Sequence, residues 1–211
     1  METLRGYNPS MLSVVIQAGG RSVRMGEDKA LKPFMDRPLI VRVIDRLRPI
    51  ADEMLLTTNS PEDYAFLNLP LFTDPKPDRG ALGGLYTALV SARNPTVAVA
   101  ACDMPFVSAE LFRAAAEIMG GEDADVVIGK TREGYQPFHA VYRREMCIPT
   151  IEAAIESNQW RVDSWLRQVR TRLLTNEEIR SHDPEELAFL NLNTPEEFTQ
   201  AEQRARRTPG T

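Results

Sequence analysis

The chain has 211 residues with 25 basic and 30 acidic side chains, which gives a formal net charge of −5. With 43% hydrophobic and 26% charged residues it has an ordinary globular composition, which excludes the disordered, collagen-like and disulfide-scaffold classes. An acidic balance, with a pI of about 5.2, argues against a nucleic-acid partner, because phosphate backbones require a basic surface. We therefore expect a single domain over residues 1–211 that binds no nucleic acid.

Membrane insertion and secretion are not expected either. No apolar run approaches the roughly 20 residues that span a bilayer, and the start of the chain lacks the basic region and apolar stretch of a signal peptide. The two cysteines, Cys102 and Cys147, lie far apart and form no CxxC pair, so neither a redox motif nor a thiolate zinc site is expected. These features favour a reducing, cytoplasmic location.

Apolar β-branched runs alternate with amphipathic segments along the chain. The runs predict strands, and apolar residues at intervals of three and four predict helices. The predicted order begins with a strand at 11–17, a helix at 38–48, strands at 53–57 and 71–73, a helix at 83–92, a strand at 96–101, a helix at 108–119 capped by Ser108, and a strand at 125–129. It continues with a strand at 137–143, a helix at 149–156, strands at 169–174 and 189–192, and a helix at 194–206.

Strands that alternate with helices predict a Rossmann-like, three-layer α/β/α domain with a mostly parallel sheet. Ligands of such sheets bind beyond the carboxyl ends of the strands. The residues that directly follow each predicted strand are therefore the candidates for a functional site.

A glycine-rich and basic segment follows the first predicted strand. Gly19 and Gly20 let backbone amides approach an anion closely, and Arg24 and Lys29 add positive charge for a polyphosphate. The spacing matches neither the dinucleotide fingerprint nor the P-loop, so both classes are excluded. The segment is either a phosphate-binding loop or a tight turn with solvated basic residues, and Asp28 either orients Lys29 or has no role.

Asp103 follows the predicted strand at 96–101 and precedes a helix. A carboxylate in this place can hold Mg²⁺ against nucleotide phosphates, because Mg²⁺ takes one or two carboxylates together with phosphate oxygens. The alternative is an aspartate that caps a turn through its own backbone. Since Ser108 already caps the following helix, the metal role is favoured.

A third candidate follows the short strand predicted at 71–73. Asp74 can accept a hydrogen bond from a base or a sugar, and Gly80, Gly83 and Gly84 leave room for a ligand ring against the backbone. The prolines between them equally fit an ordinary surface loop.

Four segments, in order along nearly the whole chain, carry a family resemblance. They are Ala18-Gly19-Gly20-x-Ser22-x-Arg24-Met25-Gly26-x-Asp28-Lys29, Gly80-x-Leu82-Gly83-Gly84, Cys102-Asp103-Met104-Pro105 and Asn191-Leu192-Asn193-Thr194-Pro195-Glu196-Glu197. Together they resemble the molybdenum cofactor guanylyltransferases, which share the fold of the nucleotide-diphospho-sugar transferases. The resemblance implies transfer of GMP from GTP to the terminal phosphate of Mo-molybdopterin, with Mg²⁺ as the cofactor and release of pyrophosphate.

The resemblance also implies residue roles by position. In a nucleotide-binding part, about residues 11–130, the implied nucleotide contacts are Gln17, Ala18, Gly19, Gly20, Lys29, Thr57, Asn59, Asp74, Gly80, Gly83 and Asp103. The implied catalytic residues are Arg24, Lys29 and Asp103, with Asp103 as the metal ligand. In an acceptor-binding part, about residues 131–205, the implied contacts are Gln136, Pro137 and Asn193.

Departures from the family pattern bear on base specificity. Gln17 replaces a usual leucine, Ala81 replaces a usual proline, and Thr57 stands where relatives can carry asparagine. Arg161 and Arg170, with Arg167 between them, either meet the phosphate of the pterin or form a solvated face.

The implied partners are GTP, Mo-molybdopterin and chaperones specific to molybdoenzymes, and we expect a monomer. The same chemistry with another base or acceptor is an alternative, in a cytidylyltransferase or a sugar-1-phosphate nucleotidyltransferase. A non-catalytic nucleotide-binding module is a further alternative. The presence of both Lys29 and Asp103 argues against such a module, because a protein released from catalysis need not keep this charge pair.

Overall fold

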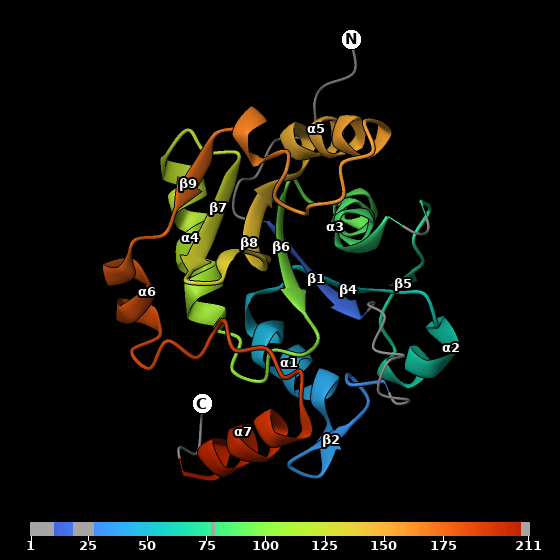
Figure 1. Ribbon diagram of the computed structural model, residues 1–211, viewed down its shortest axis with the longest axis vertical. Coiled ribbons are helices and arrows are strands. Elements are labelled where there is room, and N and C mark those ends of the chain that lie inside the picture. The colour runs from blue at the N-terminus through green and yellow to red at the C-terminus, as the bar shows by residue number, and fades with distance from the viewer. Residues whose placement is uncertain (1–10, 19–27, 77–78, 208–211) are drawn as a thin grey trace.

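A seven-stranded sheet runs through the centre of the molecule (Figure 1). The structure is a computed structural model that describes residues 11–18, 28–76 and 79–207. In sheet order the strands are β5 (Leu71–Phe72), β4 (Glu53–Thr58), β1 (Leu12–Ala18), β6 (Thr96–Ala101), β8 (Gly134–Arg143), β7 (Val126–Thr131) and β9 (Thr171–Leu173). Only β8 runs antiparallel to its neighbours in this sheet, so the predicted α/β class with a mostly parallel sheet is confirmed.

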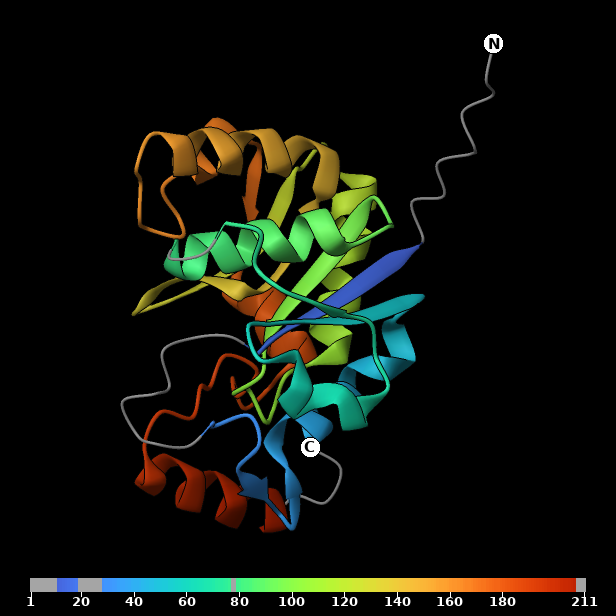
Figure 2. The same cartoon turned by 90° about the vertical axis from the view of Figure 1, so that its right-hand side faces the viewer.

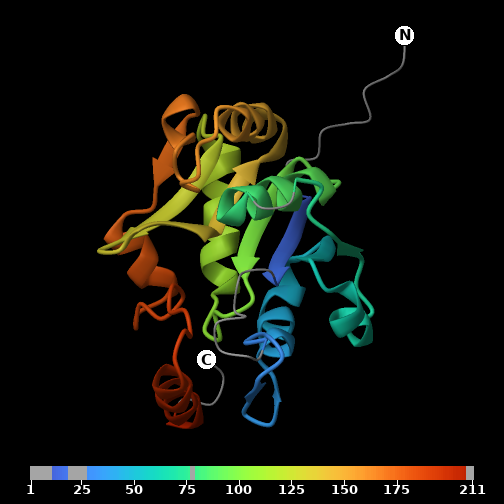
Figure 3. The ribbon, with the colours of Figure 1, turned by 45° about the vertical axis from the view of Figure 1, so that its right-hand side comes forward.

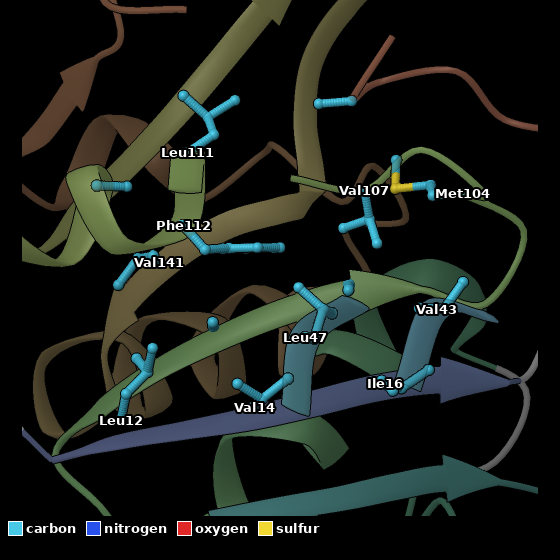
Figure 4. Close-up of a cluster of buried hydrophobic side chains, with 14 of the residues drawn as sticks. Leu12, Val14, Ile16, Val43, Leu47, Met104, Val107, Leu111, Phe112 and Val141 are labelled. Atoms are coloured by element: carbon cyan, nitrogen blue, oxygen red, sulfur yellow. The ribbon is translucent and has the colours of Figure 1, made fainter. Parts of the chain in front are cut away.

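The helices that cover the sheet are α1 (Leu39–Leu47), α3 (Gly80–Ser91), α4 (Ala109–Gly121) and α5 (Arg144–Glu156). α3 and α5 pack on one face, and α1 and α4 on the other (Figures 1 and 2). Because successive strand residues point to opposite faces, each strand feeds two cores. In β1, Val14 and Ile16 join the cluster shown in Figure 4, whereas Val15 packs under α3 and α5.

A third apolar cluster lies at one end of the molecule. The short hairpin of β2 (Pro33–Phe34) and β3 (Arg37–Pro38) meets the last helix, α7 (Pro195–Arg207), at this end (Figure 3). The buried members of the cluster are Phe34, Leu39, Phe106, Leu192, Phe198, Ala201 and Ala205. The cluster thereby fixes α7 beside the β2–β3 hairpin.

Most of the predicted elements are confirmed within a few residues. Ser108 caps α4 as predicted, since its hydroxyl accepts from the backbone N–H of Leu111 at 3.1 Å. α3 begins at Gly80 and not at residue 83, and α5 begins at Arg144 and not at residue 149. The short helices α2 (Pro61–Tyr64) and α6 (Asn176–His182) were not predicted.

The strand predicted at 189–192 is wrong. Phe189 belongs to the cluster under α4, whereas Leu192 belongs to the cluster at α7, so the segment bridges two cores and does not pair along the sheet. The backbone N–H of Leu192 donates to the carbonyl of Asp103 at 3.0 Å. Within the described ranges, no helix is long and apolar enough to cross a membrane.

Candidate functional site

The carboxyl ends of β4, β1 and β6 lie side by side at one edge of the sheet (Figure 1). In the parallel register, Gln17 of β1 lies opposite Thr57 of β4 and Ala101 of β6. Asp103 follows β6 at the same edge, since the backbone N–H of Cys102 donates to the carbonyl of Gln17 at 3.1 Å. The sheet therefore brings together candidate residues that the sequence separates by up to 86 positions, from 17 to 103.

Three polar atoms at this edge are buried and have no hydrogen-bond partner within the described part of the chain: Gln17 Oε1, Thr57 Oγ1 and Asp103 Oδ1. A buried polar atom without a partner costs about 1–3 kcal/mol, so native proteins keep few of them. Their concentration at one edge of the sheet indicates a place where a polar ligand completes the hydrogen bonding.

Lys29, Asp103 and Asn193 form the charged centre of the site. Lys29 Nζ donates to Asn193 Oδ1 at 3.1 Å, across 164 positions of sequence. Burial raises the pKa of the Asp103 carboxyl, the nearby Lys29 ammonium opposes this rise, and the Glu197 carboxylate adds to it. The site thus brings the Asp103 carboxylate, the Lys29 ammonium and the Asn193 carboxamide close together, a set suited to phosphate and a divalent cation.

Asp28 does not orient Lys29. Its carboxylate accepts from the Tyr64 hydroxyl at 2.5 Å and from the backbone N–H of Ala30 at 3.0 Å. Burial, together with this hydrogen bond to Asp28, raises the pKa of Tyr64 far above its ordinary value, so the hydroxyl remains a donor. Asp28 therefore anchors the chain just before Lys29 to α2.

Asp74 and Asn59 meet on the loops that follow β5 and β4. Asn59 Oδ1 accepts from the backbone N–H of Asp74 at 3.4 Å. Asp74 Oδ1 in turn accepts from the backbone N–H of Lys76 at 2.8 Å and from the hydroxyl of Thr87, on α3, at 3.0 Å. The Asp74 carboxylate is thereby fixed at the start of α3, with one of its oxygens already bonded to protein.

Gly80, Gly83 and Gly84 lie in the first turns of α3, and of these only Gly80 was expected in the loop before the helix. A Cβ on Gly84 would stand 1.7 Å from Gln17 Nε2, and a Cβ on Gly83 would stand 3.0 Å from Asp74 Oδ2. Gly80 has a φ of +57°, in the left-handed region that favours glycine. Glycine is therefore required here so that α3 can lie directly on two candidate nucleotide contacts.

Gln136 and Pro137 lie in the first half of β8. Because β8 is antiparallel to β6 and pairs His139 with Ala100, the residues before His139 extend past the carboxyl end of β6, toward the candidate site. The Gln136 amide is buried and donates to Thr131 Oγ1 at 2.9 Å, inside the β7–β8 hairpin. The β7–β8 hairpin thus borders the candidate site beside the carboxyl end of β6, and the Gln136 side-chain nitrogen already has a hydrogen-bond partner there.

Arg161 and Arg170 each form an ion pair with an aspartate of this chain. Arg170 precedes β9 at the amino end of the sheet, where Nη2 lies 2.6 Å from Asp125 Oδ1. Hydrogen bonding from Arg170 lowers the pKa of Asp125. Arg161 is paired with Asp163 at 2.9 Å. The alternative of a structural and solvated arginine face is supported for these two residues.

Some sequence expectations concern residues that the structure does not describe. Gly19, Gly20 and Arg24 lie outside the described residues, whereas Ala18 is the buried last residue of β1. One contributor to the site was missed. Glu197 accepts from the backbone N–H groups of Asn193 and Thr194, and the Thr-x-x-Glu spacing of a capping box was its visible signal.

This fold, with an ammonium and a carboxylate at the carboxyl edge of a mostly parallel sheet, is that of a nucleotidyltransferase. The model of the family described as "MobA-like NTP transferase domain" matches residues 14–173. The chain belongs to this family.

Individual relatives agree with the family match. The probable molybdenum cofactor guanylyltransferase of Carboxydothermus hydrogenoformans is 37% identical over 187 residues, which cover 89% of this chain and 93% of that protein. The molybdenum cofactor guanylyltransferase of Desulfosudis oleivorans is 34% identical over 191 residues, which cover 89% and 93%. The crystal structure of molybdopterin-guanine dinucleotide biosynthesis protein A from Archaeoglobus fulgidus shares the fold, with a TM-score of 0.81 at 23% identity over 93% of this chain and 100% of that one.

Proposed function

We propose that the protein transfers GMP from GTP to the terminal phosphate of Mo-molybdopterin, with release of pyrophosphate. The observation that carries this proposal is the meeting of Lys29, Asp103 and Asn193 at the carboxyl edge of the sheet. The relatives named molybdenum cofactor guanylyltransferase support the choice of base and acceptor, because they align over most of this chain.

The nucleotide lies against β1, β4 and the start of α3 in this proposal. Its contacts are Gln17, Ala18, Gly19, Gly20, Lys29, Thr57, Asn59, Asp74, Gly80, Gly83 and Asp103. The unpartnered buried atoms of Gln17 and Thr57 support a polar group of the nucleotide between β1 and β4. The acceptor lies on the other side of Lys29, against Gln136, Pro137 and Asn193.

The chemistry asks the chain mainly for position and charge. The attacking group is a phosphate monoester, whose second pKa near 6 leaves it mostly dianionic at neutral pH, so no general base is needed. The obstacle is repulsion between the attacking phosphate and the triphosphate. Lys29 and Arg24 reduce this repulsion, and Lys29 also bonds Asn193, which joins the nucleotide side of the site to the acceptor side.

Mg²⁺ fits the residues that are present. No group of three or more His, Cys, Asp or Glu side chains suited to a metal occurs among the described residues, so Asp103 with its unpartnered Oδ1 would share the ion with phosphate oxygens. When bound, the ion neutralises charge on the α-phosphate and on the departing pyrophosphate. Burial raises the pKa of Asp103, and its backbone hydrogen bond and the Lys29 ammonium both oppose this rise.

The setting in the cell follows from the same proposal. The thiols of Cys102 and Cys147 are both unpaired, which supports a reducing cytoplasm. We propose that a monomer performs the reaction and passes its product to chaperones of the molybdoenzymes.

Pyrophosphate release tests the proposal directly, with Mg²⁺ and Mo-molybdopterin present and GTP, CTP and ATP compared side by side. Release with GTP alone is the expected result. Release with CTP alone would keep the mechanism and change the base, as in a cytidylyltransferase. No release with any of the three, beside measurable nucleotide binding, would favour another acceptor or a non-catalytic module.

A further inference from the structure

Residues 188–193, here called the strap, bring Asn193 to the site without regular secondary structure. At the end near the site, Leu192 is fully buried and its N–H donates to the carbonyl of Asp103 at 3.0 Å. Asn193 then accepts from Lys29 Nζ at 3.1 Å. Segments without regular secondary structure are more mobile than helices and strands. A defined position for Asn193 therefore requires contacts that hold the strap at its other end as well.

Phe189 fixes the other end of the strap. Its ring is 9% exposed and lies over Gly129 of β7, where a Cβ would stand 2.6 Å from the far ring carbon Cζ. The ring also meets the edge of the His139 ring, with 4.9 Å between centroids and 66° between planes. His139 is stacked on Phe112 of α4 at 4.2 Å and 7°. Phe189 therefore occupies a seat built by two strands and a helix.

The seat is next to the acceptor side of the site. The pairing of β7 with β8 is irregular between Ile128 and Lys130, which places Gly129 at the break. Gln136 and Pro137 lie in the part of β8 that faces this break, between the pairing positions of Tyr135 and Ala140. One ring thus connects the strap that carries Asn193 with the hairpin that carries the other proposed acceptor contacts.

We propose that Phe189 is a positioning residue: seated on Gly129 and held by His139, its ring sets the place of Asn193 beside Lys29 and thereby the affinity for the phosphorylated acceptor. This inference rests on the proposed function, in which Asn193 contacts the acceptor. The nucleotide contacts on β1, β4 and α3 do not depend on this ring, because they are held by the sheet and by the bonds of Asp74.

The test is the variant Gly129→Ala. The backbone of Gly129 is outside the left-handed region, so alanine adds only the steric conflict with the ring. We expect the KM for Mo-molybdopterin to rise about tenfold while the KM for GTP stays within about twofold. Gly120→Ala is the matched control, since a Cβ on Gly120 meets nothing within 4 Å, and it should leave both KM values unchanged.

Two further variants separate positioning from general damage. Leucine lacks the far ring carbons, so Phe189→Leu combined with Gly129→Ala should relieve most of the rise in acceptor KM. In an Asn193→Ala background, Gly129→Ala should have little additional effect, because both changes act through one residue. If Gly129→Ala does not fold, Phe189→Ala empties the seat without a clash and should raise the acceptor KM in the same selective way.

Equal changes in both KM values, or a full additional effect in the Asn193→Ala background, would overturn the inference. A crystal structure of Gly129→Ala gives a readout that needs no turnover. We expect loss of the bond between Lys29 Nζ and Asn193 Oδ1, with the bond between Thr87 and Asp74 retained. If the wild type shows no turnover, the proposed function fails, and an unchanged Lys29–Asn193 bond in this variant would separately overturn the positioning role.

Discussion

In the proposed function the site has a nucleotide side and an acceptor side, and the structure builds these two sides in different ways. The nucleotide side rests on the ends of adjacent parallel strands, with Gln17 and Thr57 in register on β1 and β4. The acceptor side rests on the irregular strap and on a hairpin whose strand pairing breaks at Gly129. Backbone hydrogen bonds between neighbouring strands hold the nucleotide side in place. A few side chains that are distant in sequence hold the acceptor side in place. Substitutions on the acceptor side should therefore change the KM for the acceptor alone, and a single second substitution should restore it. Substitutions on the nucleotide side should instead impair several nucleotide contacts together.

The largest effect is expected where the two sides meet, at Asp103. Asp103→Asn removes the negative charge that would hold Mg²⁺. We expect kcat to fall about a thousandfold while the fold stays intact. The measurement is pyrophosphate release with GTP, alongside circular dichroism. The matched control is Asp123→Asn, an exposed carboxylate that pairs with Arg170 at the opposite end of the sheet. Undiminished turnover in Asp103→Asn would remove this residue from the metal role.

The buried His139, next to the acceptor side, should make the fold less stable in acid. Burial lowers the pKa of His139 to about 4, so between pH 6.5 and pH 4 the unfolded chain binds a proton that the folded chain does not. Stability should be unaffected by this group above pH 6.5 and should fall by about 3 kcal/mol as the pH drops to 4. Urea unfolding of His139→Phe, which keeps an aromatic ring against Phe112, should show a flatter acid limb. Parallel acid limbs for the two proteins would contradict this expectation.

Lys29→Gln separates the charge of this residue from its hydrogen bond. A glutamine amide can still donate toward Asn193, but it cannot neutralise phosphate. We expect kcat/KM for GTP to fall about a hundredfold. Asn193→Ala, by comparison, should raise the KM for the acceptor and leave the KM for GTP nearly unchanged. Identical kinetic profiles for the two variants would mean that the two sides are not separable at this contact.

The smallest effect is expected for a substitution of Gln17, which should make the fold more stable and GTP binding weaker. Its buried Oε1 has no partner within the described residues, so Gln17→Leu should raise the free energy of unfolding by about 1 kcal/mol. The KM for GTP should rise in the same variant, because the ligand loses the same oxygen. Urea unfolding and steady-state kinetics on one preparation measure both. A variant that is less stable, with an unchanged KM, would show that Gln17 is needed for packing against Gly84 alone.

The sequence predicted most strands of the central sheet and most of its covering helices well, because their signals are local. A β-branched run marks β1, and the side chain of Ser108 marks the start of α4. The strap was predicted as a strand because Phe189 and Leu192 stand in a short apolar run, and nothing local shows that the two residues belong to different cores. The contact between Lys29 and Asn193 has no local signal at all, and only the family resemblance placed Asn193 in the site.

The reversed direction of β8 has a consequence for how this site can change. Because β7 runs toward the candidate site and β8 returns from it, their turn at residues 132–133 projects at the acceptor side, at a surface connection where insertions are tolerated. The strands that would hold the nucleotide in the proposed function are joined to one another by other connections. In the proposed function, a longer or shorter turn would therefore change the surface that meets the phosphorylated acceptor and leave the nucleotide contacts on β1, β4 and α3 in place, so one donor-binding framework could serve different acceptors.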